Sequence, residues 1–171
     1  MFKFLFNLIL LFNLFIYTNF CFSKTISVVT EAWYPYVYQN EKNEPAGIDY
    51  VKCKKIFDSL GIELKIEFLP WLRALDAVKK NEADGIIDII KNPEREEFAI
   101  FSKQQLSKIE LAVFYKKNKP FQYKNLDSFS GKKVAIMRGY GYPKNFQDAK
   151  NFTKVDITGP TGSERNFKKL I

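Results

Sequence analysis

The chain has 171 residues, with 27 Lys and Arg against 19 Asp and Glu, a formal net charge of +8, no His and two Cys. Catalytic triads that need His are therefore excluded, and sites for zinc and other transition metals are poorly supplied, so we expect no metal and no other cofactor. The lysines are spread along the chain rather than gathered in one stripe, so nucleic acid is not an expected partner.

Residues 1–23 have the order of a secretory signal peptide. Lys3 is followed by an apolar run from Phe4 to Ile16 and by a short polar stretch that ends at Ser23. We expect export through the Sec pathway, cleavage after Ser23 and a periplasmic location. An uncleaved membrane anchor stays open as the alternative, because the run from Phe4 to Phe22 is nearly long enough to span a bilayer.

Cleavage would remove Cys21 and leave Cys53 as the single cysteine, so no disulfide can form within the mature chain. Cys53 falls within an amphipathic helical pattern. We therefore interpret it as a small buried core residue rather than a reactive thiol.

From Thr25 onward, short β-branched runs alternate with amphipathic helical stretches, which predicts an α/β domain with a mostly parallel sheet. The first strand is expected over residues 25–30 and the second over residues 63–69, where apolar and polar residues alternate. A third strand over residues 83–90 is largely apolar, which suits the middle of a covered sheet.

Two helices are expected between these strands. The first runs from about Tyr50 to Leu60, with Asp49 as its N-cap and Gly61 as its stop. Its candidates for the buried face are Val51, Ile56, Phe57 and Leu60. The second runs from Trp71 to about Asn81 and places apolar residues at three-residue steps, namely Leu72, Leu75 and Val78.

The next part of the chain begins with a strong helix start at Asn92, an N-cap residue followed by Pro93 and acidic residues. A strand is expected over residues 110–115, and the polar stretch 116–120 is interpreted as a crossing between lobes. A new βαβ series follows, with strands over 131–137 and 155–158 and helices over 143–151 and 163–171.

Six segments, taken in order, resemble the bacterial extracellular solute-binding proteins, family 3, the polar amino-acid type that serves ABC importers. They are TEAWYPYVY, GIDY, PWLRALDAVKKNEADGII, NPEREEFAIFS, LAVFYKKN and LDSFSGKKVAIMRGYGY. The resemblance implies a fold like that of type II periplasmic binding proteins, in which two α/β lobes close on a ligand about a hinge. Lobe 1 is expected over 24–116 and part of lobe 2 over 117–171, since the family continues past residue 171.

The resemblance also implies site residues. Arg95 stands where the family keeps its carboxylate-binding arginine, although it can equally be a surface charge that pairs with Glu94 or Glu96. Trp33 falls at the ligand-stacking aromatic and Trp71 at the opposing wall, with core packing as the alternative for both. The further candidates are Arg73, Asp88, Gly139 and Tyr140.

Each of these further candidates has its own expected role. Arg73 would aim a second positive charge into the cleft. Gly139 and Tyr140 belong to a loop before a helix, where backbone N–H groups can meet an anion. Asp88 departs from the small or hydroxyl residue that the family places seven positions before the arginine; it would meet a cationic group or cap the following turn.

We therefore predict a monomeric, non-enzymatic receptor that captures a small carboxylate-bearing solute and presents it to the membrane subunits of an ABC importer. Two alternatives stay open. One is a periplasmic enzyme of the same fold, resembling dehydratases and lyases, with Glu31 and Asp88 as the acids for general acid or base chemistry. The other is a truncated remnant that binds no ligand.

Overall fold

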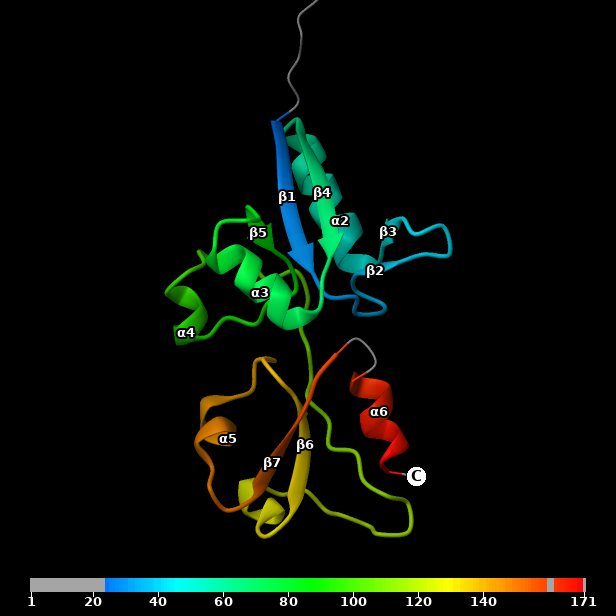
Figure 1. Ribbon diagram of the computed structural model, residues 1–171, viewed down its shortest axis with the longest axis vertical. Helices are drawn as coiled ribbons and strands as arrows, with labels where there is room; N and C mark the ends of the chain where they lie inside the picture. Colours follow the sequence, from blue (N-terminus) through cyan, green and yellow to red (C-terminus); the bar gives the residue numbers. More distant parts are fainter. Residues whose placement is uncertain (1–23, 160–161, 171) are drawn as a thin grey trace, which may run out of the picture.

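Residues 24–159 and 162–170 are described by a computed structural model, and they form two α/β lobes that lie one above the other in Figure 1. The predicted signal peptide, residues 1–23, and the last residue of the predicted C-terminal helix, Ile171, lie outside the described residues. Within the described part of the chain, no helix has the length and apolar character needed to span a bilayer.

The sheet of the first lobe is parallel, and β1 (Lys24–Thr30) is its central strand, between β4 (Ile62–Phe68) and β5 (Gly85–Ile86). The first two predicted strands are therefore confirmed to within one residue at each end. Alternating side chains of β4 turn toward the core, because a strand buries every second residue.

The predicted third strand, residues 83–90, is too long and is wrongly placed in the middle of the sheet. Only two residues of it pair with β1, at the sheet edge. Just before this pairing, the backbone N–H of Asp84 donates to the carbonyl of Ser27 at 2.9 Å, and the Asp84 carboxylate, rather than a backbone carbonyl, accepts the N–H of Ser27 at 2.8 Å. Asp88 has a φ of 60°, a left-handed conformation that ends extended structure.

Helix α2 (Ile48–Ser59) covers this sheet, but of the four residues predicted for its buried face Phe57 alone packs against the core of the described residues. Gly47 is its N-cap and Asp49 lies inside the first turn, so the predicted cap at Asp49 is wrong. The buried side chains are those of Asp49 and Cys53, and three predicted core residues are exposed, namely Val51, Ile56 and Leu60. The predicted stop is confirmed at Gly61, which has a φ of 68°.

Helix α3 (Trp71–Lys79) is likewise rotated relative to the prediction, although Val78, one of the three predicted residues, packs against the core. Its buried residues are Trp71, Ala74 and Ala77, whereas Leu72 is 43% exposed. The two alanines pack with Val29 of β1, since small side chains allow the helix to approach the sheet closely.

Helix α4 (Pro93–Glu96) is short and begins as predicted, with the Asn92 side chain accepting the backbone N–H of Arg95 at 2.9 Å. The strand predicted over 110–115 is absent: these residues are exposed and irregular, and they pair with no strand of the described residues. An apolar alternating run forms a strand only where a partner supplies the ladder.

The second lobe contains η1 (Leu126–Phe129) and two parallel strands, β6 (Lys133–Met137) and β7 (Thr153–Ile157). Helices α5 (Lys144–Asp148) and α6 (Gly162–Lys168) lie beside this pair (Figure 1). The predicted βαβ series is confirmed, with both helices shorter than predicted. The core of this lobe is aromatic, and Phe129 and Phe152 are its buried centre at a ring separation of 5.2 Å.

A small hairpin of β2 (Tyr38–Gln39) and β3 (Pro45–Ala46) fills the loop between β1 and α2. The hairpin brings Gly47 against the backbone of Tyr36, so that a Cβ at Gly47 would lie 2.6 Å from the carbonyl carbon of Tyr36.

We expect Gly47→Ala to lower the free energy of unfolding by more than about 2 kcal/mol, because φ is 115° and the added methyl group clashes with backbone. Gly61→Ala is the matched control. Its φ is 68° and its Cβ would meet nothing within 4 Å, so only the conformational cost of about 1 kcal/mol applies. Urea unfolding followed by circular dichroism measures both; equal losses would contradict the packing argument.

Candidate functional site

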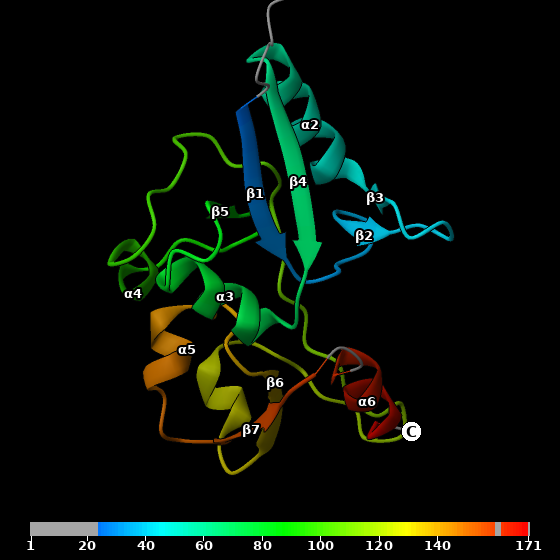
Figure 2. The same ribbon diagram turned by 45° about the horizontal axis from the view of Figure 1, so that its top comes forward.

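The two lobes meet where the carboxyl ends of their strands face each other (Figure 2). The loop that follows β6, residues 138–141, reaches across to α3 and to the start of α4. Side chains and loops at the carboxyl ends of parallel strands are the usual place for ligands in α/β proteins. We therefore take this meeting place, the interlobe cleft, as the candidate site.

Arg95 is the central residue of the interlobe cleft. Its side chain is only 4% exposed, although it is charged. One guanidinium nitrogen, Nη1, donates to the carbonyl of Ile90 at 2.6 Å, and Nη2 donates to the carbonyl of Gly139 in the second lobe at 2.8 Å. Arg95 thus joins the lobes through neutral oxygen atoms.

No carboxylate neutralises this guanidinium. Arg95 takes part in none of the ion pairs of the described residues, and Glu94 is paired with Lys79 at 3.7 Å instead. Burial lowers the pKa of Arg95 from its ordinary value. A buried charge with hydrogen bonds but no counter-charge is costly, and an anion brought to it would be strongly stabilised.

Trp71 supports Arg95 from the first lobe. The guanidinium carbon lies 5.5 Å from the centroid of the indole ring, a cation–π distance. The indole Nε1 donates to the carbonyl of Gly139 at 2.7 Å, so this one oxygen atom accepts from both Trp71 and Arg95. The Gly139 carbonyl therefore occupies two hydrogen-bond donors, from Trp71 and Arg95, that could otherwise bind an oxygen atom of a ligand.

A second bond between the lobes was not anticipated from the sequence. The Tyr140 hydroxyl donates to Glu31 Oε2 at 2.7 Å, and Glu31 Oε1 accepts the backbone N–H of Trp71 at 3.3 Å. Burial, followed by the hydrogen bond to Glu31, raises the pKa of Tyr140 above its ordinary value. Glu31 directly follows the end of β1. Its position at the carboxyl end of a strand is the sequence feature that could have pointed to a role at the cleft.

Two cavities adjoin this contact. One, of about 410 Å³, is lined by Arg95, Arg138, Tyr140 and the acids Asp76, Glu94 and Asp156, among others. The other, of about 610 Å³, is more apolar and lies against Ile90, Leu111 and Tyr142. Both are large enough for a small organic solute, and both draw their walls from the two lobes.

The predicted site residues divide into two groups. The structure brings Arg95, Trp71, Gly139 and Tyr140 together at the interlobe cleft. The other three line neither cavity: Arg73 is an exposed residue of α3, Trp33 packs on the core of the first lobe, and Asp88 lies near α2.

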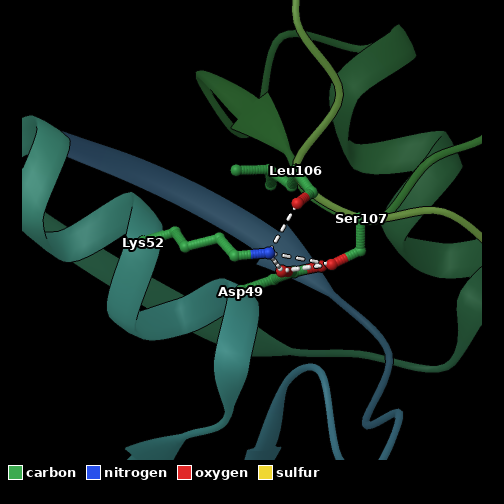
Figure 3. A network of polar contacts seen from close by, with 4 residues as sticks. All are labelled: Asp49, Lys52, Leu106 and Ser107. Carbon is green, nitrogen blue, oxygen red and sulfur yellow. Dashed lines mark hydrogen bonds and ion pairs between the residues drawn. The ribbon is translucent and has the colours of Figure 1, made fainter.

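Asp88 belongs to a polar cluster inside the first lobe that the sequence did not reveal. Its centre is Asp49, which is 1% exposed and accepts from Lys52 Nζ and from Ser107 Oγ, both at 2.7 Å. Figure 3 shows Lys52 also donating to the carbonyl of Leu106, at 2.5 Å. The cluster ties α2 to the segment that leads toward the second lobe.

The protonation of this cluster is uneven. Burial alone would raise the pKa of Asp49, but hydrogen bonds from Lys52 and Ser107 outweigh it and lower that pKa. Burial and then the charge of Asp49 raise the pKa of Asp88 to about 7. As a carboxylate, Asp88 has a buried oxygen without a partner; when protonated, it donates to Asp49.

Cys53 lies against the same cluster. Burial, together with the charges of Asp88 and Asp49, raises the pKa of the Cys53 thiol to about 11. The side chain is 5% exposed. The interpretation of Cys53 as an unreactive core residue is confirmed by this environment.

The raised pKa of Asp88 predicts a pH-dependent stability. Between about pH 4 and 7 the folded chain binds the Asp88 proton more tightly than the unfolded chain does, so stability should fall as pH rises through this range. Asp88→Asn keeps a donor toward Asp49 and tolerates the left-handed backbone. The variant should match the wild type near pH 5 and exceed its unfolding free energy at pH 8 by about 1.4 kcal/mol or more.

Urea unfolding at pH 5, 6, 7 and 8 checks this expectation. Asp58→Asn serves as the control, because Asp58 is a 51% exposed surface acid and its removal should not change the slope with pH. If the unfolding free energies of Asp88→Asn and wild type differ by the same amount from pH 5 to 8, Asp88 does not carry the proton assigned to it.

The bond between Tyr140 and Glu31 predicts an energetic coupling across the interlobe cleft. A hydrogen bond to a charged acceptor contributes about 1.5–3 kcal/mol, so Tyr140→Phe and Glu31→Gln should each destabilise the chain and be non-additive when combined. Thermal and urea unfolding of the double-mutant cycle measure the coupling. Tyr123→Phe, at a 49% exposed tyrosine of the second lobe, is the control, and additive losses would refute the contact.

Comparisons with known proteins agree with this architecture. The chain is similar in structure to ArgBP from T. maritima in its holo form, with a TM-score of 0.66 and 21% identity over 85% of this chain and 64% of that one. It is also similar to a periplasmic binding protein from Salmonella typhimurium described as highly specific for arginine, with a TM-score of 0.63 and 18% identity over 86% and 64%.

A third similar structure is an ancestral amino acid-binding protein described as a precursor of cyclohexadienyl dehydratase, with a TM-score of 0.64 and 18% identity over 85% of this chain and 65% of that one. The chain thus spans about two thirds of the length of these proteins. Among proteins of curated function, no sequence matches significantly.

The family model of the bacterial extracellular solute-binding proteins, family 3, matches residues 26–165. The match includes both sheets and the whole interlobe contact. The two lobes, their parallel sheets and the cleft between them are the fold of type II periplasmic binding proteins. The chain belongs to the bacterial extracellular solute-binding proteins, family 3.

Proposed function

We propose that the chain is a periplasmic, non-enzymatic receptor that captures a small carboxylate-bearing solute in the interlobe cleft and passes it to an ABC importer. Residues 24–116 would act as the first lobe and residues 117–171 as part of the second. The observation that carries the proposal is the buried guanidinium of Arg95, which forms no ion pair with any acid of residues 24–159 and 162–170.

A carboxylate suits this guanidinium better than the present carbonyl does. The two Nη groups of Arg95 now donate to two different neutral oxygens, whereas a carboxylate would offer two charged oxygens in the planar geometry of the fork. The incoming group would displace the Gly139 carbonyl and retain Trp71 as both a donor and an aromatic wall. Ligand binding would therefore exchange one contact between the lobes for another.

The surroundings favour a ligand with both signs of charge. The cavity of about 410 Å³ beside Arg95 also contains Asp76 and Asp156, and Asp156 lies 3.8 Å from Arg138 across its wall. An amino acid has both a carboxylate and a cationic group. Because similar structures include arginine-binding proteins, L-arginine belongs among the first solutes to test.

An enzyme of the same fold is less well supported. Neither acid considered for catalysis lines a cavity: Glu31 lies at the interlobe cleft with its oxygens accepting from Tyr140 and Trp71, and Asp88 lies inside the first lobe. A general acid or base must be within reach of its substrate. The similarity to a dehydratase precursor makes prephenate-like acids the appropriate substrates for a turnover assay.

Isothermal titration of the chain with the amino acids and with small di- and tricarboxylates tests the proposal. We expect one carboxylate-bearing solute to bind, and Arg95→Ala to weaken that binding at least about 100-fold, since removing one partner of a buried charged contact costs 2–5 kcal/mol. Arg73→Ala is the matched control. It removes an exposed arginine that lines neither cavity, and affinity should change less than about twofold.

Three results would count against the proposal. Unchanged affinity in Arg95→Ala would remove Arg95 from the site, and the absence of binding by every carboxylate would favour a chain without a ligand. Product formation from prephenate-like acids would favour the enzyme. The methyl ester of the bound solute should bind much more weakly, because it cannot supply the anion.

A further inference from the structure

The end of the second lobe that lies farthest from the interlobe cleft carries a group of lysines, which we call the polybasic end. The amino-terminal ends of β6 and β7 lie side by side there (Figure 1), with Lys133 opposite Thr153, and η1 packs near them through the contact of Phe129 with Phe152. The members of the polybasic end are Lys124, Lys132, Lys133, Lys150 and Lys154.

Hydrogen bonds hold these lysines near one another although they are far apart in sequence. The N–H of Gly131 donates to the carbonyl of Asn151 at 2.9 Å, and the Asn151 amide donates to the carbonyl of Leu126 at 3.2 Å. The segment after η1 and the segment before β7 therefore form one surface. Four of the five lysines are exposed, and Lys154 is half-buried.

The charges of the polybasic end are not compensated. None of its lysines joins an ion pair of the described residues, and Asp127 is the only acid between residues 117 and 147. In the first lobe, six lysines are paired with acids: Lys52, Lys54, Lys65, Lys79, Lys80 and Lys91.

The imbalance extends over the whole second lobe. Residues 24–116 contain 14 Lys and Arg against 15 Asp and Glu, whereas residues 117–171 contain 12 against 4. The lysines are spread along the chain, but the net positive charge of residues 24–171 is concentrated in the second lobe, because acidic residues are few there. Such a field attracts extended anionic partners.

We propose that the polybasic end is a docking surface for an anionic phospholipid bilayer. The cations of the polybasic end are all lysines. The compact, hydrated ammonium group of lysine suits a diffuse anionic surface, whereas bidentate recognition of a single phosphate favours arginine. None of the five lysines lines either cavity, so they do not surround a small anion. Tyr123, 49% exposed and adjacent to Lys124, has the amphipathic ring that is enriched at the headgroup level.

The position of the polybasic end fits this use. Strand β6 separates it from the loop of Gly139, at a length of about 13 Å for five residues. The interlobe cleft would therefore stay open to solutes while the opposite end lies on the bilayer. The proposal concerns a different surface from the ligand site and does not depend on which solute binds.

Co-sedimentation of the full chain with vesicles tests the proposal. The vesicles contain phosphatidylglycerol and phosphatidylcholine in one series and phosphatidylcholine alone in the other. Because the apolar residues 4–16 can bind any bilayer, the measured quantity is the ratio of partition coefficients for anionic over neutral vesicles. We expect a ratio of at least about tenfold at low salt, which falls as salt is added.

The decisive variant is Lys124→Gln, Lys132→Gln, Lys133→Gln and Lys150→Gln combined. Each lysine near an anionic surface contributes about fivefold, so the ratio should fall at least about tenfold. The matched control removes the same number of charges from exposed, unpaired lysines of residues 24–116, by Lys42→Gln, Lys55→Gln, Lys103→Gln and Lys108→Gln. We expect the control to retain the ratio within about threefold.

Every other outcome overturns the proposal. If the ratio of partition coefficients falls equally in both variants, net charge alone determines vesicle binding. If the ratio for the wild type is near one, the polybasic end is a solvated surface that does not bind anionic lipid. Displacement from anionic vesicles by poly-glutamate at equal charge concentration would assign this surface to an acidic polypeptide instead. Thermal melting followed by circular dichroism checks that both variants remain folded. The vesicle assay does not depend on solute binding, so a failed solute titration would contradict the proposed function and not the proposal about the polybasic end.

Discussion

The buried guanidinium of Arg95 is the group through which the first lobe binds the loop of the second lobe at the cleft. It is buried at the interlobe cleft and is satisfied only by the carbonyl oxygens of Ile90 and Gly139. Hydrogen bonds donated to neutral oxygens offset part of the cost of desolvating a charge, but they do not neutralise it. The contact that joins the lobes is therefore also one that an anion can replace, because an anion satisfies the same donors and supplies the missing charge.

Local structure fixes this guanidinium in place. The Asn92 side chain caps α4 through the backbone N–H of Arg95, and Pro93 begins the helix, so the arginine leaves the backbone at a defined angle. Trp71 at the start of α3 covers one face of the guanidinium. From the other lobe, Gly141 packs closely: a Cβ there would lie 2.7 Å from Cβ of Ile90 and 3.1 Å from Nη1 of Arg95. Glycine at this position is what allows the loop to reach the arginine.

The sequence predicted the parts of the fold that depend on local pattern. The alternation in β4, the cap at Asn92 and the stop at Gly61 are set by neighbours within a few residues, and all three are confirmed. The helix faces were wrong for a different reason. In α3 the buried face consists of Ala74 and Ala77, which a hydrophobicity pattern ranks below Leu72. The close packing of α3 on β1 decides which face of the helix is buried. The distance between the helix and the strand cannot be predicted from the sequence of the helix alone.

The site shows the same division. Motif position could single out Arg95, Trp71, Gly139 and Tyr140, since each lies at an expected strand or helix end. It could not give the bond between Tyr140 and Glu31 or the buried bond between Ser107 and Asp49, because these partners are 109 and 58 residues apart in the chain. Long-range polar pairs carry no periodicity, so they emerge only from the folded chain.

The distribution of charge separates two uses of the second lobe. At the carboxyl ends of its strands, the lobe turns the neutral carbonyl of Gly139 and hydroxyl of Tyr140 toward Arg95 and Glu31, and the cation at this end, Arg138, is paired with Asp156. At the amino-terminal ends it presents lysines without acidic partners. If those lysines stood at the interlobe cleft, they would repel Arg95 and compete with it for an anionic solute. Keeping them a strand length away allows a strongly basic lobe to close on a cationic site, and it leaves the polybasic end available for a partner of its own.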